Sequence, residues 1–167
     1  MEMAAWEAFI RSTALHRFVQ TYEPWLWPLC ETLHYLGLSL LLGTVGLFDL
    51  RVLGLAKGIP PATLHRLIPF GIGGYVVNIL TGIGFFFGHP DQYFYNDAFR
   101  FKAAFMVLAG INVVVFYTSA YREVQEMGAG ASAPLRAKII TGISLSSWVA
   151  VLICGRLLTF FRPPFFH

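Results

Sequence analysis

Four long stretches of the sequence consist almost entirely of apolar residues, and short polar segments separate them. They run from about Trp25 to Leu55, Leu67 to Gly88, Phe101 to Tyr121 and Ile139 to Phe161. A helix needs roughly 20 mostly apolar residues to cross the hydrocarbon core of a bilayer, and each stretch meets that requirement. Lipid offers no hydrogen-bond partner to the backbone, so each stretch must be helical. The pattern predicts an all-α fold, a transmembrane four-helix bundle over residues 24–162.

Residues 1–23 precede the first span and follow a different pattern. Trp6, Phe9 and Ile10 alternate with polar residues at helical spacing. This spacing is typical of a short amphipathic helix that lies along the membrane interface. A solvated helix that contacts a partner subunit would show the same pattern, and both interpretations stay open. Glu2 and Glu7, together with the missing apolar centre, argue against a cleavable signal. Residues 163–167 are expected to form a short C-terminal tail.

Composition supports the membrane interpretation. Only 13% of the residues are charged and 56% are hydrophobic, whereas soluble domains have about 25% charged residues. Lipid must therefore be the solvent for much of the surface. The net charge of +3 follows from the Lys and Arg residues that membrane proteins keep in loops, and we expect no nucleic-acid partner.

The basic residues also suggest an orientation. Residues 51–66 and 122–138 hold three Lys or Arg each, whereas the N-terminal segment, the second loop and the C-terminal segment hold two each. Cytoplasmic loops carry the excess of positive charge. The distribution favours cytoplasmic first and third loops, with both termini on the outer side.

A few polar residues interrupt the spans, and such residues usually serve a function because they are costly in lipid. Glu31 and His34 lie one helical turn apart in the first span, Lys102 opens the third span, and Arg156 lies near the end of the fourth. The predicted topology places these four in the outer half of the bundle. Asn112 occupies the middle of the third span.

His34 is the most informative of these residues. An intramembrane imidazole serves as a cofactor or metal ligand, as an interhelical hydrogen-bonding group or as a proton relay, and the sequence leaves the three roles open. Glu31 would orient the second ring nitrogen. Lys102 and Arg156 have a simpler interpretation as side chains that reach for the interface.

Other residues in the spans allow two interpretations each. Asp49 and Arg51 form a separate inner group, most simply a local pair at the end of the first span. Cys30 and Cys154 are two separate thiols or a disulfide. The second span is rich in glycine, which permits either close helix packing or the approach of a flat cofactor; these residues are Gly71, Gly73, Gly74, Gly82, Gly84 and Gly88.

Several short motifs resemble an uncharacterised family of small bacterial membrane proteins. They are Glu31-Thr-Leu-His34-Tyr-Leu-Gly-Leu, Asp49-Leu-Arg51-Val-Leu-Gly54-Leu, Phe101-Lys102-Ala and Ala109-Gly110-Ile-Asn112. That family is distantly similar to the HemJ-type protoporphyrinogen oxidases and to CopD-like copper-resistance membrane domains. By motif position, His34 matches a histidine and Lys102 a lysine that matter for haem b in the HemJ-type proteins.

The resemblance implies a haem b protein of the bacterial inner membrane, with periplasmic termini. His34 would be one axial ligand, and Lys102 or Met106 the other, unless Lys102 pairs with a propionate. Glu31, Asn112 and Arg156 complete the expected cofactor-binding set, with Arg162 as a further propionate partner. The implied function is electron transfer or a subunit role in a membrane redox complex or homo-oligomer, with a quinone or porphyrin as partner. A cofactor-free accessory subunit and a CopD-like copper-handling protein are the alternatives; any enzymatic activity would be that of a membrane oxidoreductase.

Overall fold

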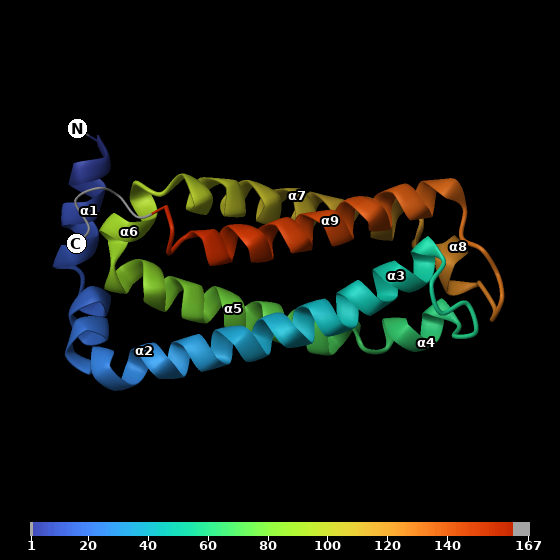
Figure 1. Ribbon diagram of the computed structural model, residues 1–167, viewed down its shortest axis with the longest axis horizontal. Coiled ribbons are helices and arrows are strands. Elements are labelled where there is room, and N and C mark those ends of the chain that lie inside the picture. The colour runs from blue at the N-terminus through green and yellow to red at the C-terminus, as the bar shows by residue number, and fades with distance from the viewer. Residues whose placement is uncertain (1, 162–167) are drawn as a thin grey trace.

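A computed structural model describes residues 2–161 (Figure 1). Within this part of the chain all regular structure is helical. The helices are α1 (Glu2–Ser12), α2 (Ala14–Leu41), the π-helical turn η1 (Leu42–Gly46), α3 (Leu47–Leu53), α4 (Pro61–His65), α5 (Ile68–Gly88), α6 (Pro90–Phe94), α7 (Asp97–Ser119), α8 (Tyr121–Gln125) and α9 (Leu135–Leu157).

Four helical segments are long and apolar enough to cross a membrane, which confirms the predicted bundle. They cover Ala14–Leu53, Pro61–Gly88, Asp97–Ser119 and Leu135–Leu157. At 1.5 Å per residue, α5, α7 and α9 extend for about 32–35 Å, enough for a hydrocarbon core of about 30 Å. We call the end of the bundle with α1 and α6 the outer end, after the predicted orientation, and the end with α4 and α8 the inner end.

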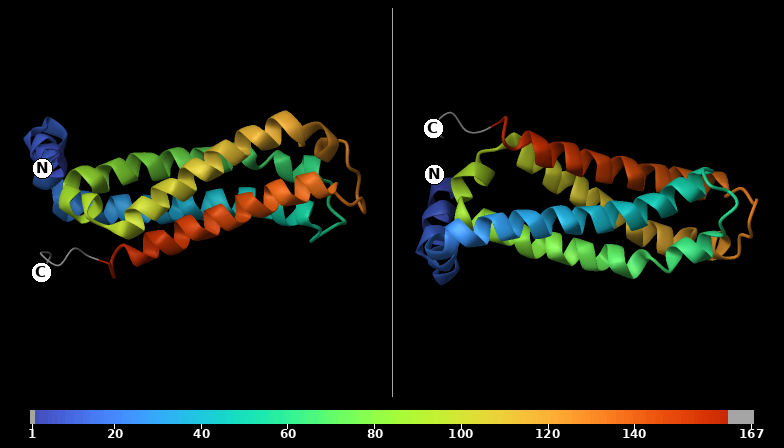
Figure 2. Two further views of the ribbon diagram at one scale, coloured as in Figure 1. Left: turned by 90° about the horizontal axis from the view of Figure 1, so that it is seen from above. Right: turned by 60° about the horizontal axis from the view of Figure 1, so that its bottom comes forward.

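The N-terminal segment lies across the outer end of the bundle (Figures 1 and 2). α2 begins at Ala14, well before the predicted span, so that Pro24 and Pro28 lie inside the helix rather than at its start. Proline removes a helical hydrogen bond and bends a helix, and α2 turns into the bundle in this region (Figure 1).

Polar contacts hold this segment against the end of α5. Gln20 Nε2 donates to the Gly88 carbonyl at 2.7 Å, and His16 Nδ1 lies 2.6 Å from the Phe87 carbonyl. Arg11 pairs with Asp91 of α6 at 3.2 Å. The opposite side of the segment is apolar and exposed, with Trp25 85% accessible. A helical segment with one apolar exposed side agrees with either of the two predicted roles, at the interface or against a partner.

Helices α2 and α5 form a tight antiparallel pair because glycines face each other across it. A Cβ atom added to Gly74 would lie 2.5 Å from the Gly37 carbonyl oxygen, and one added to Gly37 would lie 2.6 Å from the Gly74 carbonyl oxygen. Small residues let helix backbones approach closely in lipid, where packing drives association. Close packing is therefore the role of these two glycines.

Helices α7 and α9 form the second pair. Side-chain hydrogen bonds connect them at two positions along the bundle. Asn112 Nδ2 donates to the Ile140 carbonyl at 3.1 Å. At the outer end, Asn96 caps α7 through the Ala98 amide and donates to the Leu158 carbonyl at 3.0 Å. Two asparagines, one at the N-terminal cap of α7 and one within it, thus donate to backbone carbonyls in α9 and at its C-terminal cap.

The two pairs meet mainly at the inner end, where α3 packs on α9. A buried cluster fills this contact: Phe48, Val52, Phe116, Ala120, Val124, Ala133, Ala137 and Ile140. Over much of the remaining length the two pairs of ribbons diverge (Figures 1 and 2), and side chains connect them: a second buried cluster contains Leu41 of α2 together with Ala109, Trp148 and Val151 of α7 and α9. Gly54, with a φ of 118°, ends α3 in the left-handed conformation that favours glycine.

The glycine contact gives a stability prediction. Gly74→Ala should destabilise the protein by about 1–3 kcal/mol, because the new methyl group has no space against the α2 backbone. Gly73→Ala is the matched control: a Cβ there meets no atom within 4 Å, and alanine is the better helix former. Unfolding by sodium dodecyl sulfate in mixed micelles, followed by circular dichroism, measures both. Equal stability of the two variants would contradict the packing role.

Candidate functional site

His34 projects from α2 toward α5 in the outer half of the bundle. Its Nδ1 atom lies 2.7 Å from the Thr81 hydroxyl oxygen, and its ring packs edge-on against Phe85 with centroids 5.5 Å apart. The side chain is half-buried. Residues of two helices thus fix the position and the plane of the imidazole.

The contacts of Thr81 assign the tautomer of His34. The Thr81 hydroxyl also lies 2.8 Å from the Val77 carbonyl oxygen, which can only accept. A hydroxyl has one hydrogen, so both contacts are hydrogen bonds only if Thr81 donates to Val77 and His34 Nδ1–H donates to Thr81. Nε2 then carries the lone pair. This is the arrangement that metal-bound histidines use, with the distal N–H held by a neighbouring acceptor.

Lys102 approaches His34 from the other helix pair. Its ammonium group interacts electrostatically with His34 of α2 and with Cys154 of α9. A Cβ atom added to Gly155 would lie 3.8 Å from Lys102 Nζ. Among the described residues no carboxylate forms a salt bridge with Lys102. The structure therefore places the two residues that the sequence analysis paired in the same half of the bundle, close enough for the charge of Lys102 to act on His34.

Glu31 and Arg156 lie away from this pair. Glu31 is exposed, and Thr81 occupies the position beside His34 Nδ1 that was expected for Glu31. Burial raises the pKa of the Tyr93 hydroxyl in α6, and the negative charge of Glu31 raises it further. Arg156 is exposed and places its guanidinium carbon 5.2 Å from the centroid of the Phe160 ring. Arg162 lies outside the described residues.

The glycines of α5 divide into two groups. Those that face α2, such as Gly74, pack against its backbone, whereas a Cβ atom added to Gly82 would meet no atom within 4 Å. Gly82 lies seven residues after Tyr75 and four before Phe86, so the three share one side of the helix. Phe86 stacks on Phe99 of α7 at 5.9 Å. Gly82 thus leaves space on the side of α5 that faces the second pair. It follows directly after Thr81, the hydrogen-bond partner of His34.

The two cysteines are free thiols in different helix pairs. Cys30 in α2 faces α5, where a Cβ atom on Gly84 would lie 3.7 Å from its sulfur, and Cys154 is buried in α9. Of the two interpretations of the cysteines, the structure has the separate thiols.

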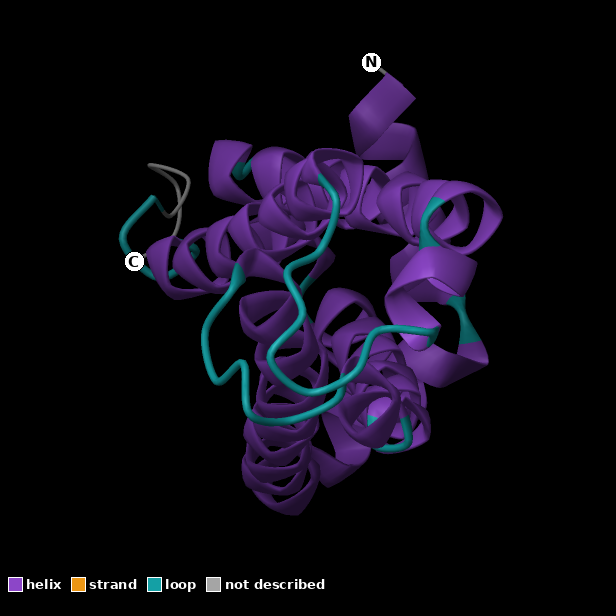
Figure 3. Ribbon diagram, turned by 90° about the vertical axis from the view of Figure 1, so that its right-hand side faces the viewer, coloured by secondary structure: helices purple, strands orange, loops and turns teal. Residues whose placement is uncertain are grey.

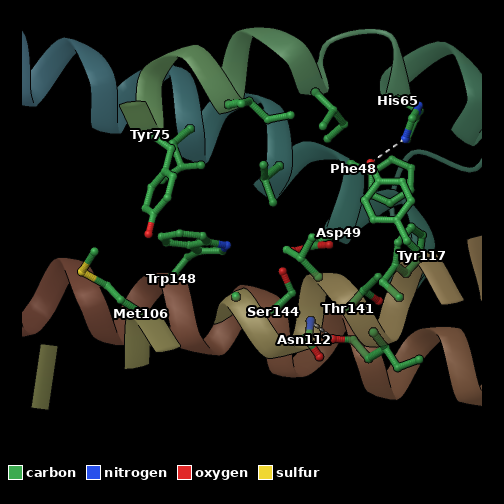
Figure 4. Close-up of a pocket in the computed structure, with 18 residues that line it drawn as sticks. Phe48, Asp49, His65, Tyr75, Met106, Asn112, Tyr117, Thr141, Ser144 and Trp148 are labelled. Atoms are coloured by element: carbon green, nitrogen blue, oxygen red, sulfur yellow. Dashed lines mark hydrogen bonds between the residues drawn. The ribbon is translucent and has the colours of Figure 1, made fainter. Parts of the chain in front are cut away.

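Asn112 and Met106 line a second region, an inner cavity of about 280 Å³ between the helix pairs (Figure 4). Asn112 is 7% exposed and hydrogen-bonded to α9. Asn112 lies more than two helical turns farther inward along α7 than Lys102. For this reason the structure does not place Asn112 close to His34. Met106 lies one turn from Lys102, where the cavity approaches the outer half.

The predicted pairing of Asp49 with Arg51 is wrong. Residues two apart in a helix point to nearly opposite sides. Asp49 lines the inner cavity. Arg51, 1% exposed, instead donates hydrogen bonds to the backbone carbonyls of Ile59, Gly128 and Ala131. Figure 3 shows the loops at this end of the bundle.

Sequence reasoning singled out Asp49 and Asn112 but did not find Thr81, nor Ser144 and Trp148 of the inner cavity. Thr81 had a detectable signal, because Gly74, Asn78 and Thr81 repeat at helical spacing and mark the side of α5 that faces α2. Trp148 and Ser144 gave no such signal: tryptophan and serine are ordinary in apolar helices, and their meaning depends on which residues of the other pair they face.

The fold and these sites define an all-α membrane protein with four spans, a fixed histidine in one half and a cavity in the other. No protein-family model matches the chain, and neither a curated protein nor a solved structure matches it.

The contacts of Arg51 predict a structural role. Arg51→Met should destabilise the protein by about 1–3 kcal/mol, because three loop carbonyls lose a buried donor. Arg66→Met, which removes an exposed arginine at the same end, is the control. Limited proteolysis in the 126–133 loop, compared with unfolding in mixed micelles, measures the effect. Proteolysis rates alike in the two variants would argue against it.

Proposed function

We propose that this protein binds haem b in the outer half of the bundle and acts in electron transfer within the membrane. The observation that carries the proposal is the hydrogen bond from His34 to Thr81, which leaves the Nε2 lone pair available for an axial bond to iron. The resemblance to HemJ-type proteins leads to the same histidine by an independent route.

The surrounding residues fit such a group. Gly82 follows Thr81, the partner of His34, and a Cβ atom added to it would meet no atom within 4 Å. Lys102, which forms no ion pair with any described carboxylate, would provide either the opposite ligand or a positive charge for a propionate. Phe85 fixes one side of the imidazole ring. A bound haem would supply one-electron chemistry.

The residues of the chain would tune that chemistry. The hydrogen bond to Thr81 increases the basicity of the His34 imidazole and holds its orientation. The positive charge of Lys102 favours any negative charge in the site. The apolar surroundings of the two spans exclude water and strengthen both effects.

The four spans make lipid the environment of the protein, and a bacterial inner membrane with periplasmic termini is the location that we propose. A quinone or a porphyrin is the proposed redox partner. Docking to a larger membrane complex or to a second copy has one observation in its favour, the exposed aromatic side of the N-terminal segment, which includes Trp6, Phe9, Phe18, Tyr22 and Trp25. The same surface is the observation that favours the cofactor-free accessory role.

A spectrum tests the assignment of His34. Protein purified in detergent from cells supplied with haem precursors should show a Soret band that shifts on reduction, and His34→Ala should lose it. Added imidazole should restore part of the band, because it replaces the missing ligand. His65→Ala, at the inner end, should retain the band. An unchanged Soret band in His34→Ala would refute the assignment.

The role of Thr81 has its own test. Thr81→Val replaces the hydroxyl by a methyl group of similar size and should weaken haem binding by about 10–100-fold. The midpoint potential should rise, because a less basic imidazole stabilises ferric iron less. Haem transfer to an excess of apo-globin and a redox titration measure the two effects.

Thr118→Val is the matched control for this experiment. Thr118 makes the same hydrogen bond to its own helix, 2.8 Å to the Val114 carbonyl, but contacts no histidine. If the two variants have equal potentials, Thr81 has only a structural role.

A further inference from the structure

The inner cavity contains buried polar atoms that lack partners. Within the described residues three such side-chain atoms have no hydrogen-bond partner: Asp49 Oδ2, Trp148 Nε1 and Asn78 Oδ1. Asn78 belongs to the contact between α2 and α5. Asp49 and Trp148 both line the inner cavity, and they are 3% and 8% exposed. Unpaired polar groups are unfavourable in an apolar site, so an occupant that pairs with both would be favoured.

The two residues that carry the unpaired atoms are neighbours in the middle part of the cavity (Figure 4). Ser144 lies close to the Asp49 carboxylate in the lining of the cavity (Figure 4), and Trp148 lies one helical turn after Ser144 on the same side of α9. The indole nitrogen of Trp148 is directed toward Asp49 and Ser144 (Figure 4). One atom is a donor and the other an acceptor, so a single hydroxyl group between them would accept from Trp148 and donate to Asp49.

The rest of the cavity requires a larger, apolar body. A water molecule needs a cavity volume of only about 10–15 Å³, and a cavity of about 150 Å³ holds a benzene ring. The inner cavity has a volume of about 280 Å³. Aromatic rings form much of its wall, including Tyr75, which packs edge-on against Trp148 at 5.6 Å. An apolar wall with a few convergent polar groups is typical of small-molecule sites.

The position of the cavity indicates the source of the ligand. Its lining includes Ile72 of α5 and Val113 and Tyr117 of α7, which are 57%, 42% and 45% exposed. These helices belong to different pairs, and their exposed side chains lie at membrane depth. A ligand would therefore enter from the bilayer, between α5 and α7.

We propose that the inner cavity binds a lipid-soluble phenol or hydroquinone, with the ring in the apolar space and the hydroxyl between Asp49 and Trp148. This site is separate from the proposed haem site, and the binding does not require haem.

Equilibrium dialysis tests the proposal, with 1-naphthol as the probe. One compartment holds the full chain in detergent and the other holds micelles without protein. Binding should be saturable with one site. 1-Methoxynaphthalene, which accepts but cannot donate a hydrogen bond, should bind at least tenfold more weakly, and so should naphthalene. Asp49→Leu and Trp148→Phe should each weaken binding of 1-naphthol by at least tenfold.

A glycine pair provides the matched control for cavity volume. Gly110 lines the cavity, and a Cβ atom there meets nothing within 4 Å, so Gly110→Leu should fill the cavity without a clash and abolish binding. Gly73→Leu adds the same side chain to α5 outside the cavity and should leave binding unchanged. Gly110→Leu also keeps the test decisive if Asp49→Leu does not fold.

Three outcomes would overturn the proposal. Equal binding of naphthalene and 1-naphthol would mean that an acyl chain or any apolar molecule fills the space. Undiminished binding in Gly110→Leu would place the probe elsewhere, and absence of saturable binding would leave water as the partner of Asp49. The colourless His34→Ala variant should still bind 1-naphthol, which distinguishes failure of this site from failure of the haem proposal.

Discussion

The close approach of α2 and α5 at Gly37 and Gly74 is the contact on which the rest of the structure depends. It places the backbone of one helix against the backbone of the next and so brings His34 within hydrogen-bonding distance of Thr81. Gly74 is used for this contact, whereas Gly82, on the side of α5 that faces α7, is not. One tight contact thus produces the oriented histidine.

The sequence was sufficient to predict the fold, because lipid permits few alternatives. Twenty apolar residues in a row must form a helix, and four such stretches give the bundle. The same reasoning paired His34 with Lys102, since depth along each span follows from residue number. It failed for Asp49 and Arg51 and for Asn112, where the direction around the helix decides the contact. That direction depends on which helices pair, and hydropathy alone does not determine the pairing.

The polar residues of the spans have different neighbours in the two halves of the bundle. In the outer half His34 and Lys102 belong to different helix pairs. A ligand between them must therefore be compatible with a neutral imidazole ring and a positive charge. In the inner half Asp49 faces Trp148 and Ser144 of α9, a carboxylate opposite neutral donors. Arg51 donates its hydrogen bonds to loop carbonyls, and no cation among the described residues forms a salt bridge with Asp49. The two regions therefore suit ligands of different chemistry within one short bundle.

The π-helical turn Leu42–Gly46 lies between these regions in the first span. Such a turn contains one residue more than an α-helical turn, and one residue corresponds to about 100° of rotation around the helix axis. Loss of one residue from this turn would restore a regular α-helical turn and leave Asp49 on the side of the cavity, whereas the same loss from the regular helix between His34 and the turn would change the direction of His34 relative to Asp49 by about 100°. An alignment of relatives by apolar segments alone would not distinguish these two deletions, although only the second would change how the two sites are oriented relative to each other.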